Sequence, residues 1–293
     1  MRPSDLTLVL IVMVIWGLNF VVAKWGLEQF PPIFMMGLRF GLVALLLLPF
    51  VKLPKKQLRG IALLSVTLGC VHFSLMFTGL KGTDAAAAAI AIQIQVPFAA
   101  LIAAVVLKDR LGWRRAGGMA LAFLGIVIMA GEPRLSGNLW PLALIIAASF
   151  MWAVANVQIK QLGAVDGFAL NAYLGLFAAP QLFLVSAVLE NGQIEALRAA
   201  DWVGWSAVLY MAVLVTIISY VMWYRVLRRY TVNQAMPFTL LVPVLGVLSA
   251  ALLLDEPLTW RVILGGVATI AGVAVIVLRR PRLAEPGATA KSV

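Results

Sequence analysis

Long apolar runs, separated by short polar or turn-forming stretches, make up most of this chain of 293 residues. A run of about 20 apolar residues can cross the hydrocarbon core of a membrane as a helix, which satisfies its own backbone hydrogen bonds there. The pattern therefore predicts an all-α integral membrane protein with ten transmembrane helices, at residues 5–23, 32–50, 60–80, 84–107, 112–130, 139–159, 167–189, 203–227, 232–254 and 259–278.

The connections between these runs carry Pro, Gly or charge, as in EQFPP, KLPKKQLR, KDRLGWRR and DEPLTW. The first run is longer than the apolar core of a typical signal peptide and lacks a clear small-x-small cleavage site, so we interpret it as a retained helix. Residues 281–293 are polar and predict a disordered cytoplasmic tail.

Lys and Arg residues orient the predicted bundle. If the N-terminus is cytoplasmic, 17 of the 23 Lys and Arg residues fall in cytoplasmic segments and 5 on the opposite side, while Arg39 lies within a span. This bias predicts a bacterial inner-membrane protein with both termini in the cytoplasm. It also explains the net charge of +11 by topology and contact with anionic membrane lipid, so no nucleic-acid partner is expected.

The composition excludes several classes of chemistry. The chain is 63% hydrophobic and 12% charged, about half the charged share of soluble domains. A single cysteine, Cys70, leaves no internal disulfide and no cysteine-based metal site. The sequence has no HExxH, GxSxG or P-loop motif, so we expect no enzyme activity, no cofactor and no metal site.

The two halves of the chain resemble each other. IWGLNFVVAK (15–24) and MWAVANVQIK (151–160) share Trp, Asn and Lys, and DRLGWRRAGGMALAFLGIVIM (109–129) aligns with EPLTWRVILGGVATIAGVAVI (256–276) at a shift of 147. Several matches in the same order indicate a duplication. The predicted repeats are 1–131 and 132–280. Five is an odd number of spans, so the second repeat is predicted to be inverted, as in many secondary transporters.

The segments WGLNFVVAK, PPIFMMGLRF, LLVPVLGVLSAALLLDEPLTW and GGVATIAGVAVIVL resemble the EamA-type branch of the drug/metabolite transporter superfamily, and more narrowly the bacterial exporters of O-acetylserine and cysteine. The resemblance covers roughly residues 5–280. It implies ten helices in two inverted halves, an inner-membrane location and efflux of small metabolites. In the first half, Asp109 stands where the family commonly has Glu.

Ionisable residues inside a membrane are costly and therefore indicate function. Arg39 lies about 10 Å past Pro32 along its helix. It could balance an anionic group of the substrate, or form a structural ion pair with Asp84 or Glu28, and we favour the ion pair. His72, the only histidine, could couple export to proton entry, or it is a neutral ring hydrogen-bonded within the bundle.

The other candidates are polar or aromatic side chains inside predicted spans. A cavity lined by aromatic rings with a few polar groups suits a small zwitterionic or amphipathic solute, although such side chains also pack helices together. Gln93 and Gln95 point about 200° apart on a helix, so at most one of them faces a central cavity directly. The predicted substrate-binding residues are Trp16, Asn19, His72, Phe73, Gln93, Gln95, Trp152, Asn156, Tyr220 and Tyr224.

These patterns together predict a secondary transporter that exports small metabolites by alternating access between inverted repeats. Amino acids and cysteine-pathway intermediates are the leading substrate class. The expected partners are a small-molecule substrate and membrane lipid, with proton coupling left open. The leading alternative is a multidrug or lipophilic-cation efflux carrier, ahead of a channel or a membrane-embedded enzyme.

Overall fold

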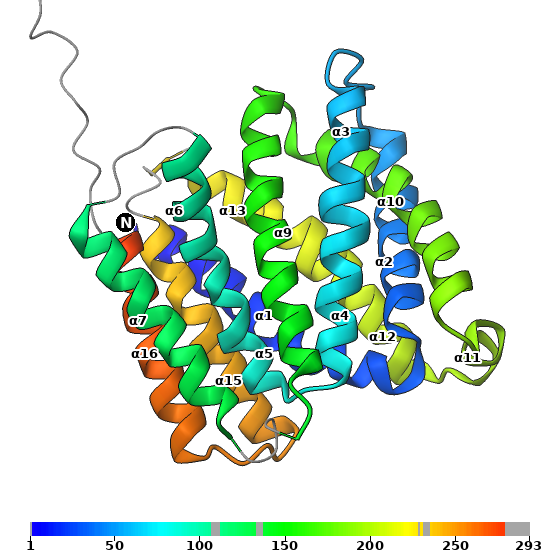
Figure 1. Cartoon of the computed structure of the whole chain (residues 1–293). Helices are drawn as coiled ribbons and strands as arrows, with labels where there is room; N and C mark the ends of the chain where they lie inside the picture. Colours follow the sequence, from blue (N-terminus) through cyan, green and yellow to red (C-terminus); the bar gives the residue numbers. More distant parts are fainter. Residues whose placement is uncertain (1, 107–111, 133–136, 228, 231–234, 279–293) are drawn as a thin grey trace, which may run out of the picture.

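A computed structural model describes residues 2–106, 112–132, 137–227, 229–230 and 235–278, which form helices and connecting turns with no β-strand among them. The helices run roughly side by side in one bundle (Figure 1). The α-helices are α1 (Pro3–Gln29), α2 (Pro32–Leu47), α3 (Leu58–Leu64), α4 (Phe73–Lys81), α5 (Ala85–Ala91), α6 (Gln95–Val106), α7 (Trp113–Ala130), α9 (Trp140–Leu162), α10 (Gly167–Leu189), α11 (Gln193–Ala199), α12 (Trp202–Leu209), α13 (Ser219–Leu227), α15 (Leu241–Leu253) and α16 (Trp260–Val277).

Several predicted spans are continuous helices whose winding changes part of the way along. Two π-helical segments, η2 (Ser65–His72) and η4 (Tyr210–Ile218), join α3 to α4 and α12 to α13. Three 3₁₀ segments are η1 (Leu48–Phe50), η3 (Ile92–Ile94) and η5 (Met236–Leu240), and η3 and η5 lead into α6 and α15. Sequence periodicity predicted the spans but not these changes of winding.

Nine helices in the described residues are long and apolar enough to cross a membrane. At the position of the predicted ninth span, Phe238–Leu253 is a shorter apolar helix. The prediction of a helical, multi-pass membrane protein is confirmed. The short helix α11, between α10 and α12, was not predicted.

Prolines and polar side chains fix several helix starts. Pro stands in the first turn of α1, α2 and α9, where its missing N–H costs no hydrogen bond. Asp166 and Asp201 accept hydrogen bonds from the first free N–H groups of α10 and α12. Asp201 also accepts from the Gln29 amide at 2.7 Å, and these hydrogen bonds hold the pKa of its carboxyl below the usual range.

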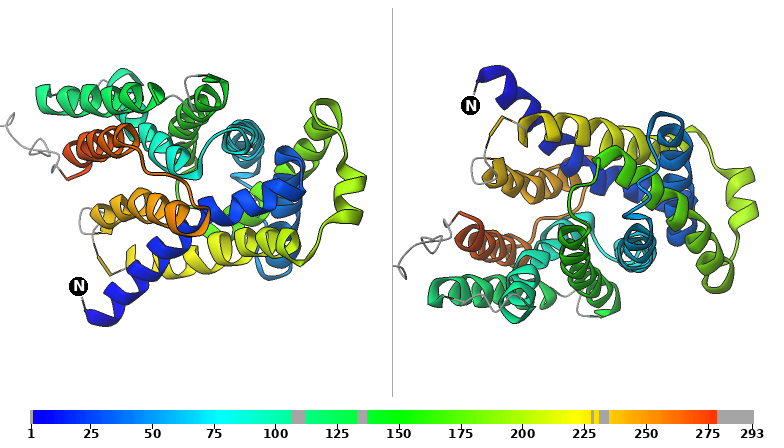
Figure 2. Two further views of the ribbon diagram at one scale, coloured as in Figure 1. Left: turned by 90° about the horizontal axis from the view of Figure 1, so that it is seen from below. Right: turned by 90° about the horizontal axis from the view of Figure 1, so that it is seen from above.

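Two helix pairs stand at opposite edges of the bundle (Figure 2): α7 with α16, and α2 with α10. The first pair is packed through glycines. A Cβ on Gly118 would lie 2.8 Å from the carbonyl oxygen of Gly272, and one on Gly125 would lie 2.5 Å from that of Gly265. The backbones approach so closely only because no side chain intervenes.

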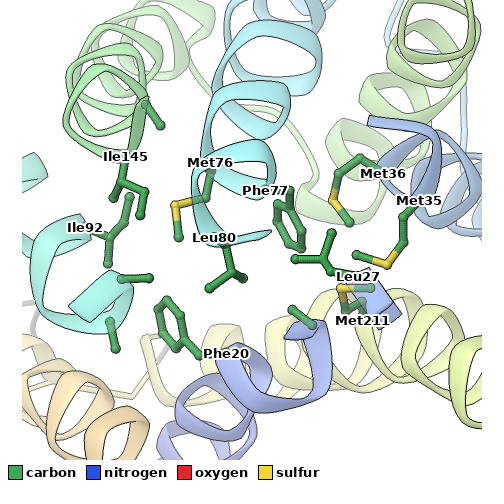
Figure 3. Close-up of a cluster of buried hydrophobic side chains, with 14 of the residues drawn as sticks. Phe20, Leu27, Met35, Met36, Met76, Phe77, Leu80, Ile92, Ile145 and Met211 are labelled. Atoms are coloured by element: carbon green, nitrogen blue, oxygen red, sulfur yellow. The ribbon is translucent and has the colours of Figure 1, made fainter. Parts of the chain in front are cut away.

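Burial is uneven along the bundle. We call the end at which α1 and α4 finish, and α2, α5, α9 and α12 begin, the distal end, and the opposite end the N-terminal end. Buried side chains from α1, α2, α4, η3, α9 and η4 meet in the distal half (Figure 3): Phe20, Leu27, Met35, Met36, Met76, Phe77, Leu80, Ile92, Ile145 and Met211. Every residue from Ala85 to Ile94 is buried, whereas Gln95 to Ile102 are mostly part-exposed.

Carboxylates tie helices together at the distal end. Glu190 accepts hydrogen bonds from the backbone N–H of Ile33 at 2.8 Å and Phe34 at 3.0 Å, at the start of α2. Glu256 accepts from Ala85 at 2.7 Å and Ala86 at 2.9 Å, at the start of α5. A carboxylate is stabilised at a helix N-terminus, where unpaired N–H groups and the helix dipole both favour negative charge. Both contacts join the first half of the chain to the second.

Candidate functional site

Arg39 lies in the middle of α2 and is only 6% exposed. Its Nη2 donates to Thr216 Oγ1 in η4 at 3.1 Å. The guanidinium carbon lies 5.0 Å from the ring centre of Phe73 and 5.6 Å from that of Phe40, which are cation–π distances.

The predicted ion pair of Arg39 with Asp84 or Glu28 is wrong. In the described part of the chain, the polar contacts of Arg39 are with the Thr216 hydroxyl and, at 4.0 Å, the Met36 sulfur. The sequence could predict that Asp84 and Glu28 lie near the same side of the membrane as Arg39. It could not predict the direction in which the Arg39 side chain points. It points across the bundle, toward the second half of the chain.

His72 ends the π-helical segment η2 and is 4% exposed. Its Nδ1 lies 2.8 Å from the carbonyl oxygen of Ala148 in α9, and because a carbonyl can only accept, Nδ1 carries a proton. The ring packs against Phe73 at 4.8 Å and Trp152 at 5.1 Å between centres. This geometry is what the neutral, hydrogen-bonded interpretation of His72 predicts.

The two duplicated tryptophans lie against the third span of the opposite half. Trp16 packs on Tyr220 at 6.3 Å and on Trp223 at 5.6 Å, while Trp152 packs on His72. Trp16, Trp152 and Tyr220 each keep part of their surface exposed. Phe73 lies against both the Arg39 guanidinium and the His72 ring, and Thr216, which binds Arg39, lies about one turn before Tyr220. We call the residues that these contacts join the central cluster: Trp16, Arg39, Phe40, His72, Phe73, Trp152, Thr216 and Tyr220.

The predicted polar residues do not all join this cluster. Gln93 is buried in η3, with its amide 3.5 Å from the Ala89 carbonyl, and Gln95 is half-buried at the start of α6. Asn156 is exposed and donates to the carbonyl of Trp152 at 3.0 Å. Asn19 is half-buried, and its Oδ1 has no hydrogen-bond partner among the described residues. The side chain of Tyr224 lies outside the described residues.

Two contributors to the cluster were missed from the sequence. Thr216 is the acceptor for Arg39, and Phe40 gives it a second ring. Thr216 is a single polar residue within the apolar run MAVLVTII, a signal that could have singled it out. Phe40 follows Arg39 directly in an apolar run and carries no comparable signal.

The lysines of the two matching segments have different surroundings. Lys24 Nζ donates to the carbonyl oxygens of Leu80, Lys81 and Thr83 at 3.3, 3.5 and 3.0 Å, around the end of α4. Lys160 is exposed near the end of α9. The lysines therefore do not belong to the central cluster, although the tryptophans of the same segments do.

A hollow of about 550 Å³ lies at the N-terminal end of the bundle, away from the cluster. The end of α2, the segment that follows it and the start of α10 form its walls. Its lining is apolar apart from Lys52 and Asp166. None of the predicted substrate-binding residues lines it.

Comparisons with known proteins find a family, two relatives and a solved structure that this chain resembles. The model of the EamA-like transporter family matches residues 4–131 and 139–278. A "Probable amino-acid metabolite efflux pump" of Escherichia coli K12 is 34% identical over 285 residues, covering 94% of this chain and 95% of that protein. A protein of the same description from Salmonella typhimurium is 35% identical, with the same coverage. A crystal structure with 18% sequence identity shares the fold, with a TM-score of 0.61 over 95% of this chain and 98% of the other.

Proposed function

The chain belongs to the EamA-like transporter family, and we propose that it is a secondary carrier that exports small amino-acid metabolites. The resemblance noted in the sequence is thereby confirmed at the level of the family. Two relatives described as probable amino-acid metabolite efflux pumps support the substrate class. Amino acids and cysteine-pathway intermediates are the leading candidates.

The central cluster is the observation that carries this proposal. Aromatic rings from both halves surround a buried cation and a buried histidine between the helices, as in a site for a small solute with both apolar and charged parts. A site between repeats at mid-depth is typical of secondary transporters.

Several contacts support two inverted repeats, 1–131 and 132–280. At the sequence shift of 147, Gly118 corresponds to Gly265 and Gly125 to Gly272. The close approaches are Gly118 to Gly272 and Gly125 to Gly265, so each glycine meets the counterpart of the other. Contacts related by a two-fold axis have this reciprocal form.

The tryptophans support the same symmetry. Trp16 in the first span packs on Tyr220 in the eighth, and Trp152 in the sixth span packs on His72 in the third. First and sixth, and third and eighth, are corresponding spans if ten are counted. Each π-helical segment, η2 and η4, also lies in one of the corresponding third spans.

The uneven burial supports an inward-facing state. Seventeen of 23 Lys and Arg residues fall on one side if both termini are cytoplasmic, which makes the distal end periplasmic in a bacterial inner membrane. The buried cluster of Figure 3 and the contacts of Glu190 and Glu256 then close the periplasmic end. Export requires these contacts to break and the cytoplasmic half to close in turn.

Counterflow in proteoliposomes tests the proposal. The full chain is reconstituted and assayed with labelled cysteine, O-acetylserine, threonine, phenylalanine and a lipophilic cation dye, with and without a pH gradient. We expect saturable exchange of at least one amino acid. Movement of the dye alone would replace amino-acid export by efflux of lipophilic cations, and flux that never saturates would indicate a channel. Chemical conversion of a supplied solute would indicate an enzyme.

A further inference from the structure

The charge on Arg39 is the feature of the central cluster that export by itself does not explain. A buried arginine in a membrane protein costs free energy unless hydrogen bonds and opposite charge compensate it. The described contacts of Arg39 supply a hydroxyl, a thioether and two rings, but no carboxylate. The site therefore carries a net positive charge within the bundle.

The guanidinium of Arg39 has a hydrogen-bond partner at Nη2 but none at Nε among the described residues. The Thr216 hydroxyl donates its proton to the Met211 carbonyl at 2.9 Å, so its oxygen is available to accept from Arg39 Nη2. That bond holds one terminal nitrogen of the guanidinium group in place. Its Nε is buried and has no hydrogen-bond partner among the described residues. A guanidinium has five N–H donors in a rigid fork, which matches the two oxygens of a carboxylate.

The surroundings of Arg39 suit a solute that carries one carboxylate, whether the rest of the solute is apolar or also bears a positive charge. Phe40 and Phe73 lie against the guanidinium, and Tyr220 lies about one turn beyond Thr216, which binds it. Trp152 is part-exposed and packs on His72, which packs on Phe73 beside the guanidinium, so a solute in contact with Trp152 would lie near Arg39. His72 donates its Nδ1 proton to the Ala148 carbonyl, and in its neutral form it adds no charge to the site.

We propose that Arg39 binds the carboxylate of the transported solute, and that the site selects small carboxylate-bearing solutes over their neutral or cationic derivatives. The inference rests on the proposed export function and narrows its substrate class. The cation at the centre disfavours lipophilic cations as substrates. The cation–π contacts stabilise the charge when no solute is bound, so a carboxylate can also be released.

The test compares solutes that differ only at the carboxylate. Threonine is paired with threoninamide, and phenylalanine with phenylalaninamide. Each is used as unlabelled competitor in counterflow, and in thermal unfolding of the purified full chain in detergent. A hydrogen bond to a charged group predicts that the acid of a recognised pair competes about 10- to 100-fold better than its amide. Only the acid is expected to raise the unfolding temperature.

Substitutions at Arg39 then separate recognition from structure. In Arg39→Gln the acid-to-amide ratio is expected to fall to about one. Arg39→Lys keeps the charge without the fork, so it should retain a reduced preference for the acid. Arg198→Gln removes an exposed arginine in α11 and should leave the ratio unchanged. A purely structural Arg39 would lower transport of acid and amide equally and leave their ratio intact.

The outcomes distinguish this inference from the proposed function. Exchange of amino acids with equal competition by acid and amide in the unmodified protein would overturn the role of Arg39 and leave export standing. An acid-to-amide ratio that stays unchanged in Arg39→Gln or Arg39→Lys would also overturn the role of Arg39 and leave export standing. If neither variant folds, the comparison of acid with amide in the unmodified protein decides whether the site selects carboxylates. Acid-specific thermal stabilisation without any exchange would contradict export and keep the carboxylate site.

Discussion

Buried polar side chains of this bundle differ in where their hydrogen bonds lead. Ser249 donates to the Leu245 carbonyl, one turn back in its own helix, at 2.6 Å. Lys24, Arg39 and His72 reach other helices instead. Residues of the second kind hold the bundle together or bind solute, and substitution tells the two roles apart.

Lys24→Met should destabilise the protein, because it removes an ammonium group that binds three carbonyls around the end of α4. We expect a loss of about 1.5–3 kcal/mol, the range for hydrogen bonds to charged groups. The matched control is Lys160→Met, which changes the corresponding exposed lysine. Thermal unfolding in detergent measures both, and equal unfolding temperatures for the two variants would contradict the role assigned to Lys24.

His72→Ala should lower stability but leave the response of transport to a pH gradient intact. The ring supplies one Nδ1–H to the Ala148 carbonyl and packs against two aromatic residues, and a neutral imidazole does both. Removing the ring loses this hydrogen bond, worth about 0.5–1.5 kcal/mol, together with the packing against Phe73 and Trp152. The measurement is exchange with and without the gradient. Loss of gradient dependence, with exchange itself retained, would instead make His72 the proton carrier.

Much of the central cluster could be predicted from single residues. Arg39 and His72 stand out because charge is rare inside spans, and Trp16 and Trp152 because they recur at matching positions. The Arg39 partner could not be predicted, since hydrophobic pattern does not determine which distant span a side chain faces. Thr216 lies 177 positions away in the chain, and only folding brings the two together.

At the scale of helices, the positions of the spans followed from the apolar runs, but their internal winding did not. The π-helical segments η2 and η4 end next to or contain residues of the central cluster, as such segments often do at functional sites. Ahead of Pro97 and Pro243 the chain winds as 3₁₀ helix, since proline cannot supply the N–H of a regular turn. The short helix α11 has too few residues for a periodic signal.

Gly118→Ala should loosen the α7–α16 pair. Its Cβ would lie 2.8 Å from a backbone carbonyl oxygen, which cannot move aside as a side-chain end could. Overpacking of this kind costs about 1–3 kcal/mol. Gly117→Ala is the control in the same helix, because its Cβ would meet nothing within 4 Å and alanine favours helix by about 0.5–1 kcal/mol. If Gly118→Ala unfolds at the same temperature as Gly117→Ala or at a higher one, the close α7–α16 contact at Gly118 is contradicted.

For the whole molecule, the proposed inward-facing state rests on the contrast between the buried half and the part-exposed half of the bundle. The segment from Ala85 to Ile94 is enclosed on all sides, and the helix after it is not. The sequence predicted a duplication, and hence two exchangeable states. The pattern of the sequence does not reveal which of the two states is the more stable. Their relative stability depends on small differences between alternative packings of the same helices.

Thiol labelling should detect the open side. In a Cys70→Ser background, we expect Asn156→Cys to react with a charged thiol reagent from the cytoplasmic side, because Asn156 is exposed one turn beyond the central Trp152. Ala88→Cys should not react, since Ala88 is fully buried in the distal half. Leu184→Cys is the control for a side chain that is 69% exposed but expected to face lipid. Labelling of Asn156→Cys no faster than of Leu184→Cys would contradict an inward-facing opening.

Trans-acceleration of efflux tests whether this chain carries a small solute by alternating between two states of its inverted halves. Proteoliposomes are loaded with a labelled amino acid that the counterflow panel identifies, and its efflux is timed with and without the same unlabelled amino acid outside. If the carrier returns faster when it is loaded, efflux of the labelled amino acid should speed up as unlabelled amino acid is added outside. The increase should saturate at high external concentration. Efflux that is indifferent to external solute and rises in proportion to the internal concentration would contradict alternating access.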